Sequence, residues 1–180
     1  MEIRKEADRL LNEFGLRKVL EKHGKIHIVG SYRMDMMTYN DLDFNIEMNN
    51  NSFEGLYALS SDINALIKPY RFEGYIIKDD NLFYGCETDI TSERWNIDIW
   101  CKKETDIIQT NEYCDNLNRQ FSANPMLKKA MIDIKQELIK LQLYGIDKSP
   151  KKHYHSTDIY EAVLNEGILS VEDFIAKYPK

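Results

Sequence analysis

The sequence predicts an α+β fold, in which a small β-sheet packs with helices and is followed by a C-terminal helical tail. Two segments, residues 41–47 and 94–101, alternate strictly between polar and apolar residues, as half-buried strands do. Apolar residues recur at helical spacing over residues 3–22, 56–67 and 125–145. The chain is therefore expected to contain both strands and helices, with the strands in its first part.

The same patterns predict how the chain is divided. Its 180 residues suffice for one core with a helical appendage and are too few for two large domains. Strand patterns end near residue 105, and the later segments have helical periodicity. We therefore expect a sheet domain over residues 1–105 and a helical extension over residues 106–180 that packs on it.

The first elements are a helix and a strand. The amphipathic helix over residues 3–22 is expected to end at Gly24, because glycine commonly follows the last helical turn. A short strand over residues 25–29 then leads into Gly30-Ser31. The interval before the strand at 41–47 is expected to hold a loop or a short helix.

A hairpin is expected in the middle of the chain. Residues 70–78 and 82–90 are two strand-like runs, and Asp79-Asp80-Asn81 between them has the composition of a turn. The alternating strand at 94–101 completes the sheet.

The tail is expected to contain three helices with recognisable starts. Asn124-Pro125 precedes the strongest apolar stripe, since asparagine caps helices and proline suits their first turn. Two short helices follow Ser156-Thr157 and Ser170, and the Ser-x-x-Asp spacing at Ser170 resembles a capping box.

The composition is that of an ordinary globular protein, with 43% hydrophobic and 30% charged residues. No apolar run approaches the roughly 20 residues that a membrane span needs, and the first residues lack the apolar core of a signal peptide. We expect a cytoplasmic protein without a membrane partner.

The net charge and the cysteine spacing argue against two further classes of protein. The net charge of −6 argues against a protein that wraps long nucleic acid, because affinity for phosphate backbones comes from clustered Lys and Arg. The three cysteines have no metal-ligand spacing and are expected to be reduced, partly buried thiols. Nothing in the sequence fixes the oligomeric state, and a homodimer stays open.

The strand at 41–47 places several polar groups on one face. Asp41, Asp43, Asn45 and Glu47 share this face, while the apolar residues between them point into the core. Carboxylates at positions i and i+2 can converge on shared cations, and Mg²⁺ prefers such oxygen ligands. A DxD pattern alone is equally consistent with two surface aspartates on a strand.

Two further elements strengthen the pattern. Gly30 and Ser31 follow a strand, where backbone amides and a hydroxyl can bind a phosphate, although a simple turn has the same sequence. Asp98 lies among isoleucines in the strand at 94–101. If this strand neighbours that of Asp41, Asp98 becomes a third metal ligand and can accept a proton from an attacking hydroxyl.

Together, Val29-Gly30-Ser31, Asp41-Leu42-Asp43-Phe44 and the later Asp98 resemble the motifs of the polymerase-beta nucleotidyltransferase superfamily over residues 24–101. Among its members, the antibiotic and the minimal nucleotidyltransferases are the most similar that we can suggest. The resemblance implies a small mixed β-sheet of the nucleotidyltransferase type with helices on one face. It also implies an enzyme, in which Gly30 and Ser31 bind the triphosphate. Asp41 and Asp43 would coordinate two Mg²⁺ ions, and Asp98 would coordinate one and assist deprotonation.

By this resemblance the reaction transfers a nucleoside monophosphate, expected to be AMP, from a nucleoside triphosphate to a hydroxyl. A small polar acceptor such as an antibiotic is the first expectation. Transfer to a protein, as in a toxin–antitoxin pair, and a non-catalytic nucleotide-binding module both stay open. Arg33 is a further candidate for the phosphates, because guanidinium pairs well with them. Glu47, Glu87 and Glu93 are candidates for an additional base or for attracting a cationic acceptor.

Overall fold

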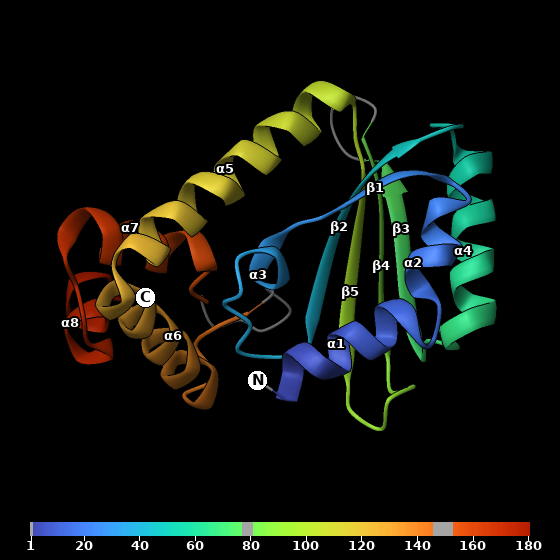
Figure 1. The fold of residues 1–180 in the computed structure, drawn as a ribbon. Helices are drawn as coiled ribbons and strands as arrows, with labels where there is room; N and C mark the ends of the chain where they lie inside the picture. The colour runs from blue at the N-terminus through green and yellow to red at the C-terminus, as the bar shows by residue number, and fades with distance from the viewer. Residues whose placement is uncertain (1, 77–80, 146–152) are drawn as a thin grey trace. The chain divides into compact units, whose positions relative to one another are not determined.

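The computed structural model describes residues 2–76, 81–145 and 153–180. Its elements follow each other in the order α1-α2-β1-α3-β2-α4-β3-β4-β5-α5-α6-α7-α8 (Figure 1). The chain divides into two compact units, unit 1 up to Asn116 and unit 2 over Leu117–Lys180. The division falls within α5 (Glu104–Ala123), and so later in the chain than the end of the strand pattern at residue 105.

Unit 1 contains a five-stranded mixed sheet with the order β1-β2-β5-β4-β3. Strands β2 and β5 are parallel, and the other neighbours are antiparallel. The expected strands are confirmed, whereas the expected turn at 79–81 lies largely outside the described residues. The bounds are β1 Gly24–Ile28, β2 Asp41–Met48, β3 Arg71–Ile76, β4 Leu82–Thr88 and β5 Trp95–Cys101.

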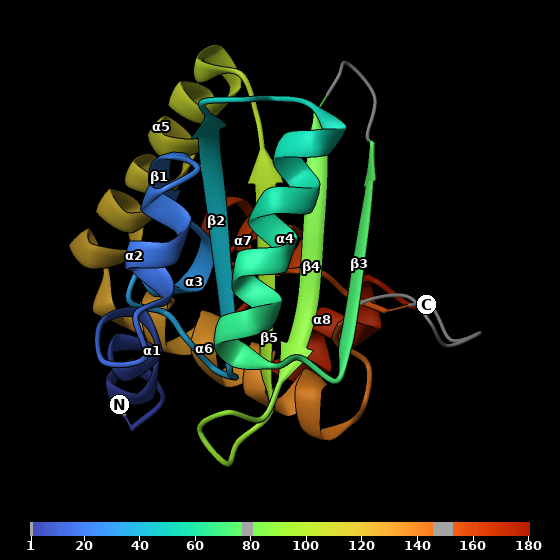
Figure 2. The same ribbon diagram turned by 90° about the vertical axis from the view of Figure 1, so that its right-hand side faces the viewer.

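Helices α1 (Glu2–Asn12), α2 (Leu16–Glu21) and α4 (Phe53–Ile67) bury their apolar residues in one core with the sheet (Figure 2). The single helix expected over residues 3–22 is wrong, because Gly15 separates α1 from α2. Gly15 has a φ of +84°, a left-handed conformation that glycine adopts without steric cost. The apolar periodicity continues across this break because both helices face the same core.

The predicted division of β2 and β5 into an apolar face and a polar face is confirmed. Leu42, Phe44 and Ile46 of β2 are completely buried in the core, as are Ile97 and Ile99 of β5. The polar residues that alternate with them therefore lie on the opposite face of the sheet.

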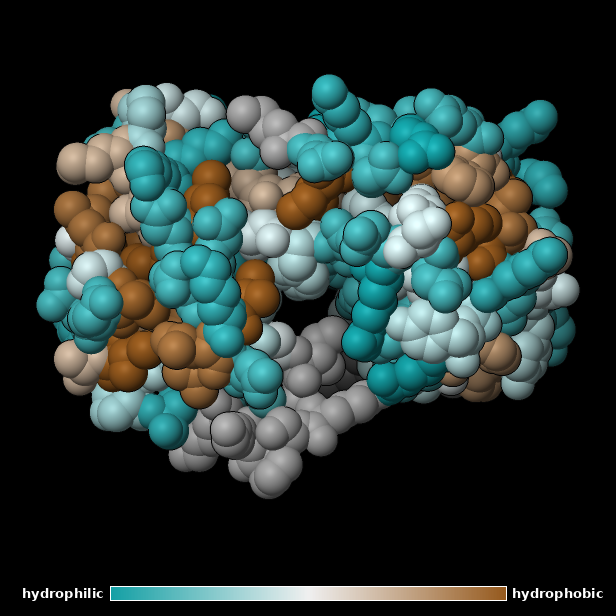
Figure 3. All heavy atoms as spheres, turned by 90° about the horizontal axis from the view of Figure 1, so that it is seen from below, coloured by the Kyte–Doolittle hydropathy of each residue, from teal (hydrophilic) through white to brown (hydrophobic). Residues whose placement is uncertain are grey.

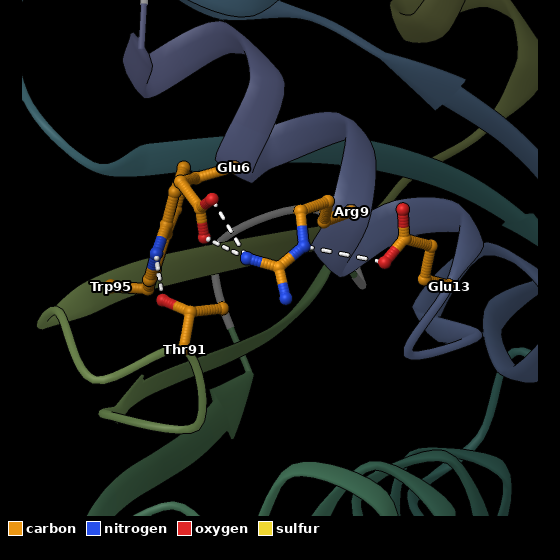
Figure 4. A network of polar contacts seen from close by, with 5 residues as sticks. All are labelled: Glu6, Arg9, Glu13, Thr91 and Trp95. Atoms are coloured by element: carbon orange, nitrogen blue, oxygen red, sulfur yellow. Dashed lines mark hydrogen bonds and ion pairs between the residues drawn. The ribbon is translucent and has the colours of Figure 1, made fainter.

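Two polar contacts lie on or beside α1 (Figure 4). Arg9 donates hydrogen bonds to Glu6 and Glu13, one turn away on either side. Arg9 and Glu13 are exposed, so solvent screens these pairs and they add little to the stability of the helix. Trp95 is fully buried, and its indole Nε1 donates to Thr91 Oγ1 over 2.9 Å.

Unit 2 contains the end of α5 together with α6 (Pro125–Lys140), α7 (Ser156–Glu166) and α8 (Val171–Lys177). The expected caps are present: the Asn124 side chain accepts from the Leu127 amide, and Ser170 Oγ accepts from the Asp173 amide. Its buried apolar residues include Phe121, Met131, Ile134, Leu138, Tyr154, Ile159 and Phe174.

The surface is mixed in character. On the face drawn in Figure 3, hydrophilic residues are interspersed with apolar ones. None of the helices in the described part of the chain is long and apolar enough to cross a membrane.

Gly15 provides a test of the break between α1 and α2. A Cβ added there meets nothing within 4 Å, so Gly15→Ala is destabilising only through its positive φ. We expect a loss of about 1–2 kcal/mol, or a Tm lower by several degrees. Gly15→Asn should lose less, because asparagine tolerates this conformation better. A thermal melt in which the alanine variant matches wild type contradicts the assigned conformation.

Candidate active site

The polar face of the sheet carries three rows of side chains that run across the strands. Each row follows from the strand register, since directly paired residues point to the same face. The carboxylate row is Asp43-Asp98-Gly85-Glu73. The flanking row is Asp41-Asn96-Glu87-Arg71, and the third row is His27-Asn45-Trp100-Phe83-Tyr75.

The three predicted aspartates lie on this one face. Asp43 and Asp98 are direct partners on the parallel strands β2 and β5, whose backbones lie about 4.8 Å apart. Asp41 precedes Asp43 by two residues and so lies about 7 Å along the same strand. The expectation that the strand of Asp98 neighbours that of Asp41 is confirmed.

Asp41 is fixed by two side chains. Its carboxylate accepts a hydrogen bond from the Tyr39 hydroxyl and one from the Asn96 amide, each over 2.9 Å. The residue is 8% exposed. These donors satisfy a buried charge, as a buried carboxylate requires.

Asp98 is in a less favourable environment for its charge. Burial, and then repulsion from the Asp41 carboxylate, raise the pKa of Asp98 to about 7. A hydrogen bond with the Asn96 side chain acts in the opposite direction on this pKa. Near neutral pH the carboxyl group of Asp98 can therefore both hold and release a proton.

Gly30 lies directly against the Asp43 carboxylate. It begins the short helix α3 (Gly30–Arg33) with a φ of +62°. A Cβ at this position would lie 2.1 Å from Asp43 Oδ2, which no side chain allows. The preceding Val29 amide donates to the Asp43 carbonyl over 2.9 Å. Glycine is therefore favoured here by its positive φ, and a side chain at this position would also push the Asp43 carboxylate out of its present orientation.

Ser31 presents an unused hydrogen-bonding group beside this turn. It is 6% exposed, and its Oγ has no hydrogen-bond partner among the residues that the structure describes. A buried hydroxyl without a partner costs free energy, which a bound ligand oxygen can recover.

Arg33 has partners other than a phosphate. Its guanidinium makes two hydrogen bonds with the Asp115 carboxylate, over 2.8 and 2.9 Å, and a third with the Asn111 side chain. Both partners belong to α5, and Asn111 also contacts His27 of β1. Arg33 therefore ties α3 to the first part of α5, an arrangement that the sequence pattern did not reveal.

The aspartates do not form an assembled metal centre in the described structure. Within residues 2–76, 81–145 and 153–180, no group of three or more His, Cys, Asp or Glu side chains lies close enough to hold one ion. Three nearby carboxylates repel each other when no cation is between them. Their oxygen donors are nevertheless the type that Mg²⁺ prefers.

Lys102 is a further residue of the candidate active site, which the sequence analysis did not identify. It directly follows β5, and its Nζ lies 5.2 Å from the centroid of the Trp100 ring. Burial lowers the pKa of Lys102, while the charges of Asp106 and Asp43 raise it. Its position four residues after Asp98 could have indicated this role, because the alternation of β5 places residue 102 on the polar face. Trp95, on the opposite face of the same strand, is buried in the core.

One of the three cysteines lies beside the Gly30 turn, since the Cys114 side chain has a hydrogen bond with the backbone of Gly30. Cys86, Cys101 and Cys114 are free thiols and all are buried. Burial raises the pKa of Cys86 and of Cys101 to about 12, so both are inert as nucleophiles. The expected reduced state is confirmed.

No family model and no curated protein matches the chain. Solved structures do match. The Cid1 poly(U) polymerase aligns with a TM-score of 0.65 and 16% identity, over 89% of this chain and 48% of its own. The polymerase core of TRAMP, an RNA surveillance complex, aligns with a TM-score of 0.65 and 18% identity, over 97% and 59%. A cytoplasmic RNA terminal U-transferase gives 0.60 and 17%, over 89% and 46%.

This chain thus spans roughly half the length of those proteins. At such low identity the likeness concerns the fold. The mixed five-stranded sheet with helices on its apolar face, together with these matches, shows that the chain has the polymerase-beta-type nucleotidyltransferase fold.

Proposed function

We propose that the chain is a magnesium-dependent nucleotidyltransferase that transfers a nucleoside monophosphate, AMP in the first instance, to an acceptor hydroxyl. The observation that supports this most is the contact between the Gly30 turn and the Asp43 carboxylate, with Asp98 paired beside it. A phosphate-binding turn and two acidic side chains at one point of a sheet are the parts that phosphoryl transfer needs.

Each residue has a role in this proposal. The Gly30 and Ser31 backbone and the Ser31 hydroxyl bind the triphosphate, which gives that buried hydroxyl a partner. Asp98 accepts the proton of the acceptor hydroxyl as its oxygen bonds to the α-phosphorus. The bond from this phosphorus to the bridging oxygen breaks, and pyrophosphate leaves.

Asp41, Asp43 and Asp98 would hold two Mg²⁺ ions, which would supply positive charge to offset that of the triphosphate and the charge that develops in the reaction. The donor set fits them, since all three ligands are hard oxygens. Because the carboxylates are not clustered in the described structure, their side chains would have to turn toward a shared ion.

Arg33 has a weaker claim than the sequence suggests. Its bidentate pair with Asp115 would have to break before the guanidinium could reach a phosphate. Lys102, half-buried on the catalytic face, is the better candidate for neutralising phosphate charge.

An RNA 3′-end is the second candidate for the acceptor. It is favoured by the neighbours in fold, which are named as poly(U) polymerase and RNA terminal U-transferase. The net charge of −6 and the acidic sheet face favour a small acceptor instead. A screen for pyrophosphate release with each nucleoside triphosphate, and with both RNA and small alcohols, tests the function and separates the two acceptors.

Replacing Asp43 by Asn removes the charge next to the Gly30 turn while the polar face of β2 stays intact. We expect turnover to fall at least 100-fold, an order of magnitude typical of lost electrostatic stabilisation, measured as pyrophosphate release. Asp62→Asn is a matched control, because Asp62 lies on α4, which packs on the apolar face of the sheet, and its carboxylate pairs with Lys22 and His23. Equal turnover in the Asp43 variant and the control rules out the assigned site.

Mg²⁺ and a nucleoside triphosphate should stabilise the protein together far more than either does alone, because the metal relieves carboxylate repulsion and completes the phosphate site. At a ligand concentration 100 times the Kd the gain is about 2.7 kcal/mol. Differential scanning fluorimetry with metal, nucleotide and both measures it. Purely additive shifts in Tm speak against a metal-bridged nucleotide.

Without metal, Asp98→Asn should stabilise the protein at alkaline pH. The folded-state pKa of about 7 lies above the ordinary value of 3.8, so wild type loses stability as pH rises between these values. Asn does not titrate. In EDTA, the Tm of the variant should therefore exceed that of wild type at pH 8, and the difference should shrink toward pH 4. A difference that is independent of pH contradicts the raised pKa.

A further inference from the structure

Three side chains on one face of α5 contact the chain segment that contains the Gly30 turn. They stand at positions i, i+3 and i+4 of the helix and so point to the same side: they are Asn111, Cys114 and Asp115. They contact His27 of β1, the Gly30 backbone and Arg33 of α3, in that order. All of these residues belong to unit 1. One helix face therefore holds the turn itself and the chain on both sides of it.

The turn needs this support because α3 is too short to maintain its own conformation. It has four residues, about one helical turn, and a single turn is unfavourable to form in isolation. The Ser31 hydroxyl, the proposed phosphate ligand, is buried and has no hydrogen-bond partner among the described residues. A group that is fixed before its ligand arrives binds that ligand more tightly, because less ordering is left to occur on binding. The contacts with α5 therefore bear directly on nucleotide affinity.

The side-chain amide of Asn111 joins two of these contacts, and Arg33 determines how it is oriented. A guanidinium group has only N–H donors, so the Asn111 atom that faces it, over 3.0 Å, must be the carbonyl oxygen Oδ1. The amide nitrogen Nδ2 then faces His27 Nδ1, over 3.1 Å, and can only donate. His27 Nδ1 must therefore be the unprotonated nitrogen of a neutral imidazole ring.

The surroundings of His27 favour this neutral form. Burial, and then the positive charges of Lys25 and Arg33, lower the pKa of His27, whereas the Glu47 carboxylate on β2 raises it. On α5, the carboxylate of Asp115 is paired with Arg33. The ring is therefore neutral near pH 7 and gains a proton only under acidic conditions.

We propose that Asn111 is a positioning residue for the triphosphate, which fixes the Gly30 turn against α5 only while His27 is uncharged. A proton on His27 Nδ1 would set two N–H donors against each other. The amide cannot reverse to accept from the ring, because its nitrogen would then face the donors of Arg33. Protonation therefore breaks the bridge between β1, α3 and α5. The inference rests on the proposed function, since its ligand is the nucleotide of that reaction, and it adds a pH dependence to nucleotide binding.

Nucleotide binding to the full chain tests this role. Calorimetry with Mg²⁺ and a non-hydrolysable ATP analogue gives the Kd at about pH 7.5 and at about pH 5.5, on either side of the usual pKa of histidine. We expect Asn111→Ala to raise the Kd about fivefold or more at the higher pH, because both hydrogen bonds of the amide are lost. Alanine suits a helix, so the variant should fold, and a thermal melt checks that it does.

The pH profile separates positioning from a merely structural contribution. Protonation of the nucleotide and of the aspartates weakens binding at acidic pH in every variant, so the measure is the ratio of the acidic Kd to the neutral Kd. His27→Asn places an amide oxygen near the position of Nδ1 and does not titrate. It should keep the Kd at the higher pH within about twofold and lower the ratio about threefold or more relative to wild type. Asn111→Asp accepts from Arg33 and from a protonated ring, so it should lower the ratio as well.

His23→Asn is the matched control, because His23 pairs with Asp62 of α4 on the apolar side of the sheet, and both of its Kd values should match wild type. Failure of the wild-type protein to bind the ATP analogue refutes the proposed function itself. Normal binding by wild type together with an unaltered Kd in folded Asn111→Ala, or with the wild-type ratio in His27→Asn, overturns the role of Asn111 alone. If Asn111→Ala does not fold, the ratio for His27→Asn still decides.

Discussion

The pairing of Asp43 with Asp98 across two parallel strands is the constraint on which the polar face depends. It places two carboxylates on neighbouring backbones, and the second of them is largely buried. Such an arrangement is unfavourable in isolation, because burial and repulsion both disfavour the charged form. The surrounding structure accommodates it: Tyr39 and Asn96 donate to Asp41, and Asp98 retains its proton up to about pH 7. The hydrophobic core lies on the opposite face of the sheet and contains none of these polar groups, so its packing does not depend on them.

Much of the fold could be predicted because its strands are half-buried. Alternation in β2 and β5 specifies both the element and the face of each aspartate, and the predicted faces are correct. The break at Gly15 could not be predicted, since both helices bury the same stripe and the periodicity carries no mark of the interruption. The two strands of the hairpin could be predicted from their strand-like composition, while its turn lies largely outside the described residues.

The three aspartates of the candidate site could be named from the sequence, whereas the residues around them could not. Asp41, Asp43 and Asp98 could be proposed from spacing because strand geometry alone brings i and i+2 to one face. The pairing of Arg33 with Asp115 joins residues far apart in the chain, so no local sequence pattern could predict it. The row Trp100, Phe83 and Tyr75 likewise arises only from the register of three strands. Strand alternation also separates the two tryptophans of β5, because Trp95 is buried in the core and Trp100 lies half-buried on the polar face.

The contact between Gly30 and Asp43 has an evolutionary consequence. Since the carboxylate occupies the space that a side chain at position 30 would need, a substitution at position 30 would force the Asp43 side chain to turn. A descendant that loses the acidic group at position 43 gains room at position 30, where only the positive φ would still favour glycine. Substitutions at positions 30 and 43 should therefore tend to occur together among proteins that share this turn.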